Sequence, residues 1–174
     1  MSTLTILVVD DEEGIRSGVS RILSNFQVSY PFMDADLSFD VLEAATGEDA
    51  IEKIKTTKID IILLDNKLPG IQGTDVLEFT SRNNPDILVL MITSYASLEL
   101  ALKATSHGAH DFIPKPFTPQ ELKSAIENVS KHIFLRGMTQ KMKKEGKEVR
   151  FQFLSVLSHE LKAPLNAIEG YLRI

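Results

Sequence analysis

Four apolar runs of the sequence each end in residues with charged or hydroxyl side chains. The runs are 6–9, 59–64, 87–92 and 111–113, and the residues at or just after their ends are Asp10 and Asp11, Asp65, Thr93, and Lys115. Continuously apolar runs are typical of strands buried on both faces of a parallel sheet. Parallel strands bring their carboxyl ends to one edge, where open α/β sheets bind ligands. We therefore expect a single site of three carboxylates, a hydroxyl and an ammonium group.

This set of side chains suits phosphoryl transfer. An aspartate can accept a phosphoryl group as an acyl phosphate, and the transfer needs mainly positioning and charge neutralisation. Asp65 suits the acceptor role, and Asp11 and Asp65 are expected to bind Mg²⁺ directly, with Asp10 acting through water. Lys115 would offer a positive charge to a phosphoryl oxygen, and Thr93 a hydroxyl donor. An acidic pair after a strand often only caps the next helix, but four such strand ends in this order favour a site.

The elements that must position these residues alternate between strand and helix patterns. Strands are expected over Thr5–Val9, Asp40–Ala44, Ile59–Leu64, Ile87–Ile92 and Ala109–Ile113. Helices are expected over Glu12–Asn25, Gly47–Lys55, Gly73–Arg82, Ser97–Ser106 and Pro119–Ile133. Five parallel strands with crossover helices make a doubly wound α/β domain. The second strand is the most polar and suits an edge of the sheet.

The length, amino-acid composition and charge of the chain exclude several classes of protein. A chain of 174 residues can hold one well-buried domain and an appendage, and without cysteine it has no disulfide or thiolate metal site. No apolar stretch is long enough to span a membrane and the polar start is no signal peptide, so a cytoplasmic location is the default expectation. Residues 1–133 carry a net charge of −9 and residues 134–174 one of +4. Acidic residues interrupt the basic tail and no aromatic residues interleave with it, so we expect no nucleic-acid partner.

The segment 26–39 is longer than a usual connection between a helix and a strand. Because it follows a helix and precedes a strand, we expect it at the end of the sheet opposite the carboxylates, away from the chemistry. Its large apolar side chains are expected to cover the base of the domain, although they could instead form a surface for a partner. They are Tyr30, Phe32, Met33 and Phe39.

Residues 4–133 resemble the receiver domain of bacterial response regulators. The motifs that carry the resemblance are Val8-Val9-Asp10-Asp11-Glu12, Leu64-Asp65-Asn66-Lys67-Leu68-Pro69-Gly70, Thr93-Ser94 and Lys115-Pro116-Phe117. The resemblance implies a flavodoxin-like fold with a five-stranded sheet in the order 2-1-3-4-5. It also implies that Asp65 is the phosphoacceptor and that the phosphodonor is a histidine kinase or a phosphotransfer protein.

The same resemblance assigns roles to the residues around Asp65. The backbone carbonyl of Lys67 would join Asp10 and Asp11 as a Mg²⁺ ligand. Thr93 and Lys115 would contact the phosphoryl group. Phe112 would pack inward as Thr93 moves, although without the hydroxyl that many receivers have at this position. Lys67 and Tyr95 stand two residues after Asp65 and Thr93, and we hypothesise that these long side chains shield the phosphoryl group from water and lengthen its lifetime.

A second helical pattern begins after residue 150. Six apolar residues recur at steps of 3, 4, 4, 3 and 4, namely Leu154, Leu157, Leu161, Leu165, Ile168 and Leu172. We expect this stripe to need a partner helix, and hence a homodimer through the C-terminal helix. Gly137 and Gly146 are expected to weaken the helix that links it to the receiver-like part.

Within this stripe, Ser158-His159-Glu160-Leu161-Lys162-Ala163-Pro164-Leu165 resembles the phosphoacceptor box of dimeric histidine kinases. His159 is expected on the polar face, and a neutral exposed imidazole can accept a phosphoryl group. By the resemblance, His159 would be autophosphorylated with Glu160 as its acid/base partner. The resemblance covers the first helix of a two-helix hairpin, and no segment resembles an ATP-binding loop.

These patterns divide the chain into a receiver domain (1–133), a helical linker (134–150) and a truncated phosphoacceptor helix (151–174). The leading interpretation is a fragment of a histidine kinase that its receiver regulates, in which ATP binds only to a kinase domain outside this chain. That kinase would act on a downstream response regulator, while this chain alone would catalyse only its own aspartyl phosphorylation and dephosphorylation. The alternative is a stand-alone response regulator or binding module with a dimerising tail. Haloacid-type phosphatases are disfavoured because Asp65-Asn66-Lys67 lacks their second acid.

Overall fold

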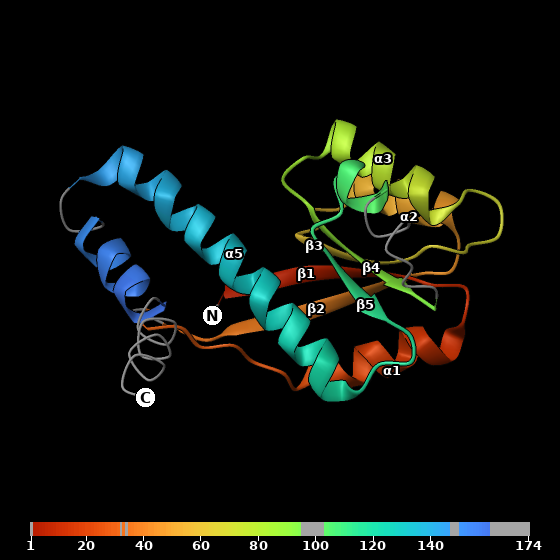
Figure 1. The fold of residues 1–174 in the computed structure, drawn as a ribbon, viewed down its shortest axis with the longest axis horizontal. Helices are drawn as coiled ribbons and strands as arrows, with labels where there is room; N and C mark the ends of the chain where they lie inside the picture. The colour runs from red at the N-terminus through yellow and green to blue at the C-terminus, as the bar shows by residue number, and fades with distance from the viewer. Residues whose placement is uncertain (1, 32, 34, 95–102, 147–149, 161–174) are drawn as a thin grey trace, which may run out of the picture. The chain divides into compact units, whose positions relative to one another are not determined.

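The computed structural model describes residues 2–31, 33, 35–94, 103–146 and 150–160. The chain divides into two compact units, one of residues 1–28 and 35–129 and the other of residues 29–34 and 130–174. The first unit contains the sheet and the second contains the C-terminal helical part (Figure 1). No helix among the described residues is both long enough and apolar enough to cross a bilayer.

The sheet of the first unit has five parallel strands in the order β2-β1-β3-β4-β5. They are β1 (Ser2–Val9), β2 (Leu37–Ala44), β3 (Ile61–Asp65), β4 (Leu88–Thr93) and β5 (Asp111–Pro114). The expected fold and strand order are confirmed, and the polar second strand lies at an edge. Asp65 and Thr93 are themselves the last residues of their strands, one position beyond the predicted strand ends.

Helices lie on both faces of this sheet, with α2 and α3 on one side and α1 and α5 on the other (Figure 1). Their bounds are α1 Glu13–Ser24, α2 Gly47–Thr56, α3 Gly73–Asn83 and α5 Pro119–Glu145, and residues 103–106 are also helical. The first part of the predicted helix Ser97–Ser106 lies outside the described residues. Because both faces are covered, every residue of β3 is buried.

The segment 26–39 is anchored to the start of β2. Val28 and Leu37 form an antiparallel bridge with N···O distances of 3.0 and 2.8 Å, which explains why β2 starts three residues earlier than predicted. Phe39 is buried and stacks on Phe26 with ring centroids 5.7 Å apart. The covering role is therefore confirmed for Phe39. Tyr30 is also buried, but it belongs to the second unit and stacks on Phe134 with ring centroids 5.4 Å apart, and Phe32 lies outside the described residues.

Helix α5 is longer than the sequence pattern indicated. Its start is as expected, since Thr118 Oγ1 accepts a hydrogen bond from the backbone N–H of Glu121, and the carboxylate of Glu121 accepts one from the backbone N–H of Thr118. Gly137 does not interrupt the helix, because α5 continues through it to Glu145. A helical glycine costs only about 1 kcal/mol, which neighbouring helix formers such as Lys, Met and Gln offset. The helix ends before Gly146, whose φ of +89° does not fit a helix.

Residues 150–160 of the second unit are helical, but their buried face differs from the predicted stripe. Val156 is buried, while Leu154 on the predicted stripe is 60% exposed. Glu160, one helical turn after Val156, pairs with Lys131 of α5 at 2.9 Å. A face of the helix other than the predicted stripe is therefore the one that packs within the second unit, and Leu154 of the stripe stays exposed. The later stripe residues from Leu161 onward, and Pro164, lie outside the described residues.

Candidate functional site

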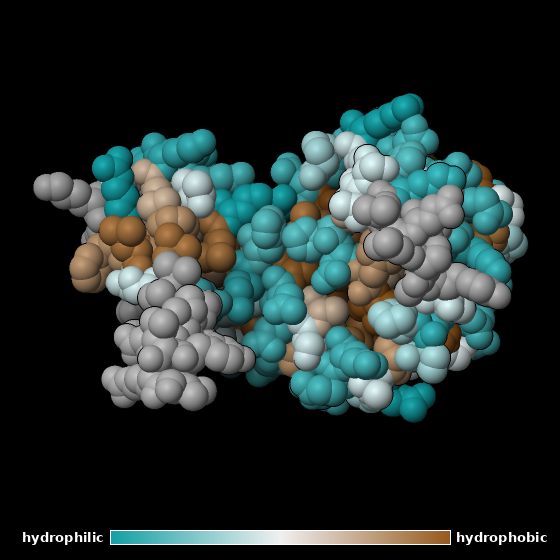
Figure 2. Space-filling view, viewed as in Figure 1, coloured by the Kyte–Doolittle hydropathy of each residue, from teal (hydrophilic) through white to brown (hydrophobic). Residues whose placement is uncertain are grey.

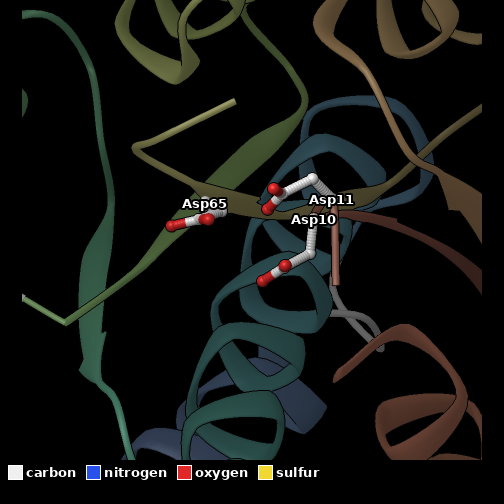
Figure 3. Close-up of side chains that lie close together, drawn as sticks. All are labelled: Asp10, Asp11 and Asp65. Atoms are coloured by element: carbon white, nitrogen blue, oxygen red, sulfur yellow. The ribbon is translucent and has the colours of Figure 1, made fainter. Parts of the chain in front are cut away.

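Three carboxylates meet at the carboxyl edge of the sheet. Asp10 and Asp11 follow β1 and Asp65 ends β3, and their oxygens lie within 4.8 Å of one another. Figure 3 shows the three side chains gathered in this way from the two neighbouring strands. Asp10 and Asp65 are buried, whereas Asp11 is exposed. The sequence prediction that these acids form one site is therefore supported by their positions.

Lys115 supplies the positive charge of this site. Its Nζ lies 2.6 Å from Asp10 Oδ2, and 3.5 Å from both Asp65 Oδ2 and Glu12 Oε1. The Lys115–Pro116 peptide bond is cis. Although burial lowers the pKa of Lys115, the hydrogen bond to Asp10 and the charges of Asp10, Asp65 and Glu12 raise it more. Lys115 is therefore a fixed cation, as its proposed role requires.

Several neighbouring groups shift the pKa of the Asp65 carboxyl group in opposite directions. Burial is the largest influence and raises the pKa of its carboxyl group above the ordinary value of 3.8, and the negative charge of Asp10 adds to this. The charge of Lys115, a hydrogen bond from the backbone N–H of Lys67 and one from the Lys115 ammonium group act in the opposite direction. The net pKa is raised because desolvation and the charge of Asp10 together outweigh Lys115 and the hydrogen bonds.

The pocket above these residues has a volume of about 290 Å³. Its lining consists of Asp11, Glu12, Asp65, Lys67, Thr93, Ser94 and Lys115. Thr93 is buried, and its carbonyl accepts the backbone N–H of Lys115 at 2.9 Å, which joins the ends of β4 and β5. Asp10 lies beneath this lining with both oxygens engaged, one by Lys115 and the other by the N–H of Glu12 at 2.9 Å. Tyr95, the other rim residue of our hypothesis, lies outside the described residues.

A second cavity adjoins this pocket on the side of α1. It has a volume of about 470 Å³ and shares Glu12, Ser94 and Lys115 with the pocket. Its other lining residues are Gly14, Ile15, Gly18, Val19, Ile22, Pro116 and Phe117. A Cβ atom added at Gly14 or Gly18 would meet nothing within 4 Å, so this side of α1 leaves room for a partner. We call this surface the α1 groove.

Arg16 is a site residue that the sequence reasoning missed. Its Nη1 donates to the carbonyls of Asp10 at 2.8 Å and Asp11 at 3.1 Å, while its Nε lies 3.3 Å from Glu43 of β2. These bonds fix the backbone turn that presents the two acids. A single arginine in the first turn of a helix gives no signal that it bonds backward to the preceding loop, so only the structure reveals this role.

Gly73 was also missed as a determinant of the site. It is the first residue of α3, and a Cβ atom there would lie 2.1 Å from the carbonyl oxygen of Asp65. Its N–H donates to the carbonyl of Asn66 at 3.1 Å. The close approach of α3 to the end of β3 therefore requires glycine, and it fixes the backbone that carries the Asp65 side chain.

Besides Asp10, the predicted functional residues Phe112, His159 and Glu160 are not among the residues that line the pocket. Phe112 lies on β5, half-buried and packed against the core. His159 is exposed on the helix of residues 150–160. Glu160 pairs with Lys131, and both belong to the second unit. His159 and Glu160 therefore belong to a different unit from the residues of the sheet edge.

The receiver-domain model of response regulators matches residues 6–127. The chain belongs to the response regulator receiver family. The chain is 29% identical to the response regulator UvrY of Escherichia coli K12 over 173 residues, which cover 96% of this chain and 75% of UvrY. It is also 38% identical to the regulatory protein LuxO of Vibrio cholerae over 92 residues, 53% of this chain and 20% of that protein.

Solved structures agree with this assignment. The receiver resembles a CheY-like response regulator receiver domain protein from Methanospirillum hungatei at 32% identity, with a TM-score of 0.63 over 75% of this chain and 96% of the other. It also resembles the receiver domain of a LuxO repressor protein from Vibrio parahaemolyticus, at 27% identity with a TM-score of 0.70 over 83% and 99% of the two chains. The receiver resemblance of residues 4–133 is thus confirmed. The relatives are response regulators, so they favour our alternative interpretation over an attached histidine kinase.

Proposed function

We propose that this chain is a response regulator that receives a phosphoryl group on Asp65 and reports it through its C-terminal helices. The observation that carries the proposal is the grouping of Asp10, Asp11 and Asp65 within 4.8 Å, with Lys115 at 3.5 Å from Asp65. Such a site places three carboxylates around one buried acceptor, with the Lys115 ammonium group beside it. Two-component signalling in the cytoplasm is the setting that fits this chemistry.

The proposed reaction is the formation of an acyl phosphate. An ionised oxygen of Asp65 attacks the phosphorus of the donor, and a new oxygen–phosphorus bond forms as the bond to the donor breaks. The donor group leaves with the electron pair of that bond, as an imidazole from a phosphohistidine or as acetate from acetyl phosphate. Hydrolysis by water reverses the modification and returns Asp65 to a carboxylate.

A divalent cation fits the acidic group. Several carboxylates within reach of one another form the oxygen donor set that Mg²⁺ prefers, and Lys115 alone leaves them incompletely neutralised. Asp11, Asp65 and the backbone carbonyl of Lys67 would hold the ion, and Asp10 would contribute through water because both its oxygens are already engaged. When bound, Mg²⁺ supplies positive charge to the phosphoryl oxygens.

Lys115 and Thr93 are proposed to hold the phosphoryl group once it is attached. The Lys115 ammonium group is 3.5 Å from the acceptor and can bind a phosphoryl oxygen, and Thr93 is a buried hydroxyl on the lining of the same pocket. Phe112 on β5 lies three residues before Lys115, and α5 begins four residues after it at Pro119. We propose that movement of Thr93 and Phe112 carries the phosphorylation state to α5.

The phosphodonor is proposed to be a histidine kinase or a phosphotransfer protein that docks in the α1 groove. This groove shares Lys115 and Glu12 with the phosphorylation pocket, so a donor seated there would have its phosphohistidine next to Asp65. Its walls are apolar, with Ile15, Ile22 and Phe117 available for contact and open space beside Gly14 and Gly18.

We also propose that the chain forms a homodimer through its C-terminal helix.

A kinase-associated function is the second candidate. His159 is exposed on a helix and is followed by Glu160, an arrangement suited to an autophosphorylated histidine. In this version the receiver would regulate His159, and a downstream response regulator would receive its phosphoryl group. To distinguish the response regulator from the kinase, the gene product is purified at its native length and incubated with radiolabelled ATP. Label that His159→Gln removes and Asp65→Asn leaves would favour the kinase, and an absence of label would rule it out.

The first test of the leading proposal is the intact mass of the chain with Mg²⁺ and acetyl phosphate. We expect one added phosphoryl group, which is lost in the Asp65→Asn variant, in the presence of EDTA and after mild base. The His159→Ala variant serves as the matched control and should still take up the group. An unmodified mass under all conditions, or an adduct that survives Asp65→Asn, would contradict the assignment of Asp65.

A further inference from the structure

A groove in the second unit shares no lining residue with the Asp65 pocket. It has a volume of about 440 Å³ and lies between the end of α5 and the start of the helix of residues 150–160. Its lining residues are Thr139, Met142, Lys143, Arg150, Phe153 and Leu154. We call it the basic groove, because its polar wall carries two cations and no acid.

The other walls of this groove are apolar and open to solvent. Leu154 is 60% exposed and its neighbour Phe151 is 72% exposed, and these are the large apolar residues most open to water among those the structure describes. Figure 2 shows apolar residues gathered in this part of the second unit and bordered by hydrophilic ones. Apolar side chains exposed beside a groove are typical of a binding surface for another macromolecule.

The charge of this surface indicates what it binds. Neither Lys143 nor Arg150 forms an ion pair with any residue in the described part of the chain. Lys141 and Lys144 are exposed on the same end of α5. Residues 141–150 together hold five Lys or Arg against two Glu, so the segment keeps a net positive charge. A ligand that fills the groove should therefore combine an apolar face with negative charge along its sides.

Two occupants from this chain itself fit poorly. The segment 161–174 carries Lys162 and Arg173 against the single acid Glu169, so its charge has the same sign as the groove. A second copy would bring residues 134–174, whose net charge of +4 has the same sign as the groove. A nucleic acid would leave Met142 and Leu154 without apolar contacts.

We propose that the basic groove binds an amphipathic helix of another protein, with apolar residues on one face and Asp or Glu beside them. Its apolar residues, spaced three and four apart, would enter between Met142 and Leu154, as in other helix-in-groove complexes. Its acidic residues would pair with Lys143 and Arg150. This inference concerns a surface separate from the Asp65 pocket and does not depend on phosphorylation of Asp65.

The test uses two synthetic peptides of about 18 residues, long enough to form a helix. Both carry the same leucine stripe, which is flanked by Glu in one peptide and by Lys in the other. Fluorescence anisotropy with the full chain should show micromolar binding of the acidic peptide and at least tenfold weaker binding of the basic one. The double variant Lys143→Glu/Arg150→Glu should reverse this preference, whereas Lys58→Glu/Lys103→Glu, at exposed lysines of the first unit, should preserve it.

A third variant separates apolar recognition from simple attraction of charges. Leu154→Ser should weaken binding of the acidic peptide at least fivefold even at high salt, where exposed charges are screened. Equal affinities for both peptides, or no effect of Leu154→Ser, would overturn the proposal. It would also be overturned if vesicles containing phosphatidylserine or a DNA duplex bound more tightly than the acidic peptide. Sedimentation equilibrium showing a dimer that Leu154→Ser dissociates would assign the groove to a second copy instead.

Discussion

The ammonium group of Lys115 lies 2.6 Å from Asp10 but 3.5 Å from Asp65. The closest partner of the proposed phosphate-binding cation is thus the acid below the pocket and not the acceptor. A phosphoryl group on Asp65 would add negative charge on the pocket side of Lys115 and compete with Asp10 for it. This relationship makes Lys115 a natural link between phosphorylation and the start of α5.

Replacing Lys115 by methionine should separate phosphoryl transfer from metal binding. We expect phosphorylation by acetyl phosphate to slow by about 100-fold, the usual cost of losing one charged donor in such a site. Mg²⁺ should bind roughly 3- to 10-fold more tightly, because a positive charge within 4 Å of Asp10 and Asp65 is removed. Intact mass over time and isothermal titration with Mg²⁺ measure the two effects. Lys58→Met, at an exposed lysine, is the control, and weaker Mg²⁺ binding in Lys115→Met would contradict the argument.

Replacing Asp65 by asparagine should change how stability depends on pH in the absence of metal. Burial raises the pKa of Asp65 above 3.8 in the folded state, so its contribution to stability is fully present below pH 3.8 and is lost as pH rises through the folded pKa. Asparagine does not ionise, so the variant does not lose stability in this way as pH rises. In EDTA, Asp65→Asn should therefore be more stable than the wild type near neutral pH, and the difference should shrink towards pH 3.8.

Urea denaturation at a series of pH values measures this difference. Asp36→Asn is the control, because Asp36 is an exposed carboxyl group in the same unit. A difference between Asp65→Asn and the wild type that grows as pH falls would show that Asp65 has the opposite shift. Adding Mg²⁺ should stabilise the wild type more than the variant, because the ion offsets the unfavourable charge.

Gly73→Ala should damage both the fold and the site. The new Cβ atom would lie 2.1 Å from the carbonyl oxygen of Asp65, and removing such overlap requires the backbone of β3 or α3 to move. We expect a loss of about 1–3 kcal/mol in the free energy of unfolding and at least tenfold slower phosphorylation. Gly18→Ala on α1 is the matched control, since nothing lies within 4 Å of its added Cβ and alanine favours a helix. A Gly73→Ala protein as stable as the wild type would contradict this account.

Arg16→Met should weaken Mg²⁺ binding without removing any ligand. Arg16 bonds the carbonyls of Asp10 and Asp11, and its loss would let the turn that carries both acids move. We expect about tenfold weaker binding of Mg²⁺ by isothermal titration, in the range seen when residues that orient metal ligands are removed. Arg21→Met, at an exposed arginine of the same helix, should bind Mg²⁺ as the wild type does. Unchanged Mg²⁺ binding in Arg16→Met would show that the turn carrying Asp10 and Asp11 keeps its conformation without Arg16.

Gly18→Leu should distinguish protein phosphodonors from small ones. The leucine would fill the α1 groove without a clash at its Cβ, so the fold and phosphorylation by acetyl phosphate should stay within about twofold of the wild type. Transfer from a phosphorylated histidine kinase of the same organism should slow at least tenfold, because the docking surface is blocked. The transfer of radiolabel from the phosphorylated kinase to each protein measures this rate. Equal transfer to both proteins would place the docking surface elsewhere.

The sequence by itself determined the α/β class, the alternation of elements and the identity of the pocket residues. Runs such as 59–64 predict a strand covered on both faces because they are apolar at every position but one, and a charged residue at the end of such a run must lie at the edge of the sheet. Asp10, Asp11, Asp65, Thr93 and Lys115 could therefore be assigned to one place before any coordinates were known. Local patterns sufficed here because strand direction fixes which ends meet.

Only the tertiary structure decided how the site is held and how the C-terminal part folds. The bonds of Arg16 to the Asp10 and Asp11 carbonyls, and the approach of Gly73 to Asp65, join elements whose spacing no local pattern encodes. The stripe of Leu154 indicated a helix correctly but not its buried face, which is centred on Val156. A periodic pattern shows that a helix has an apolar side, whereas the residue that becomes buried depends on where the neighbouring helix lies.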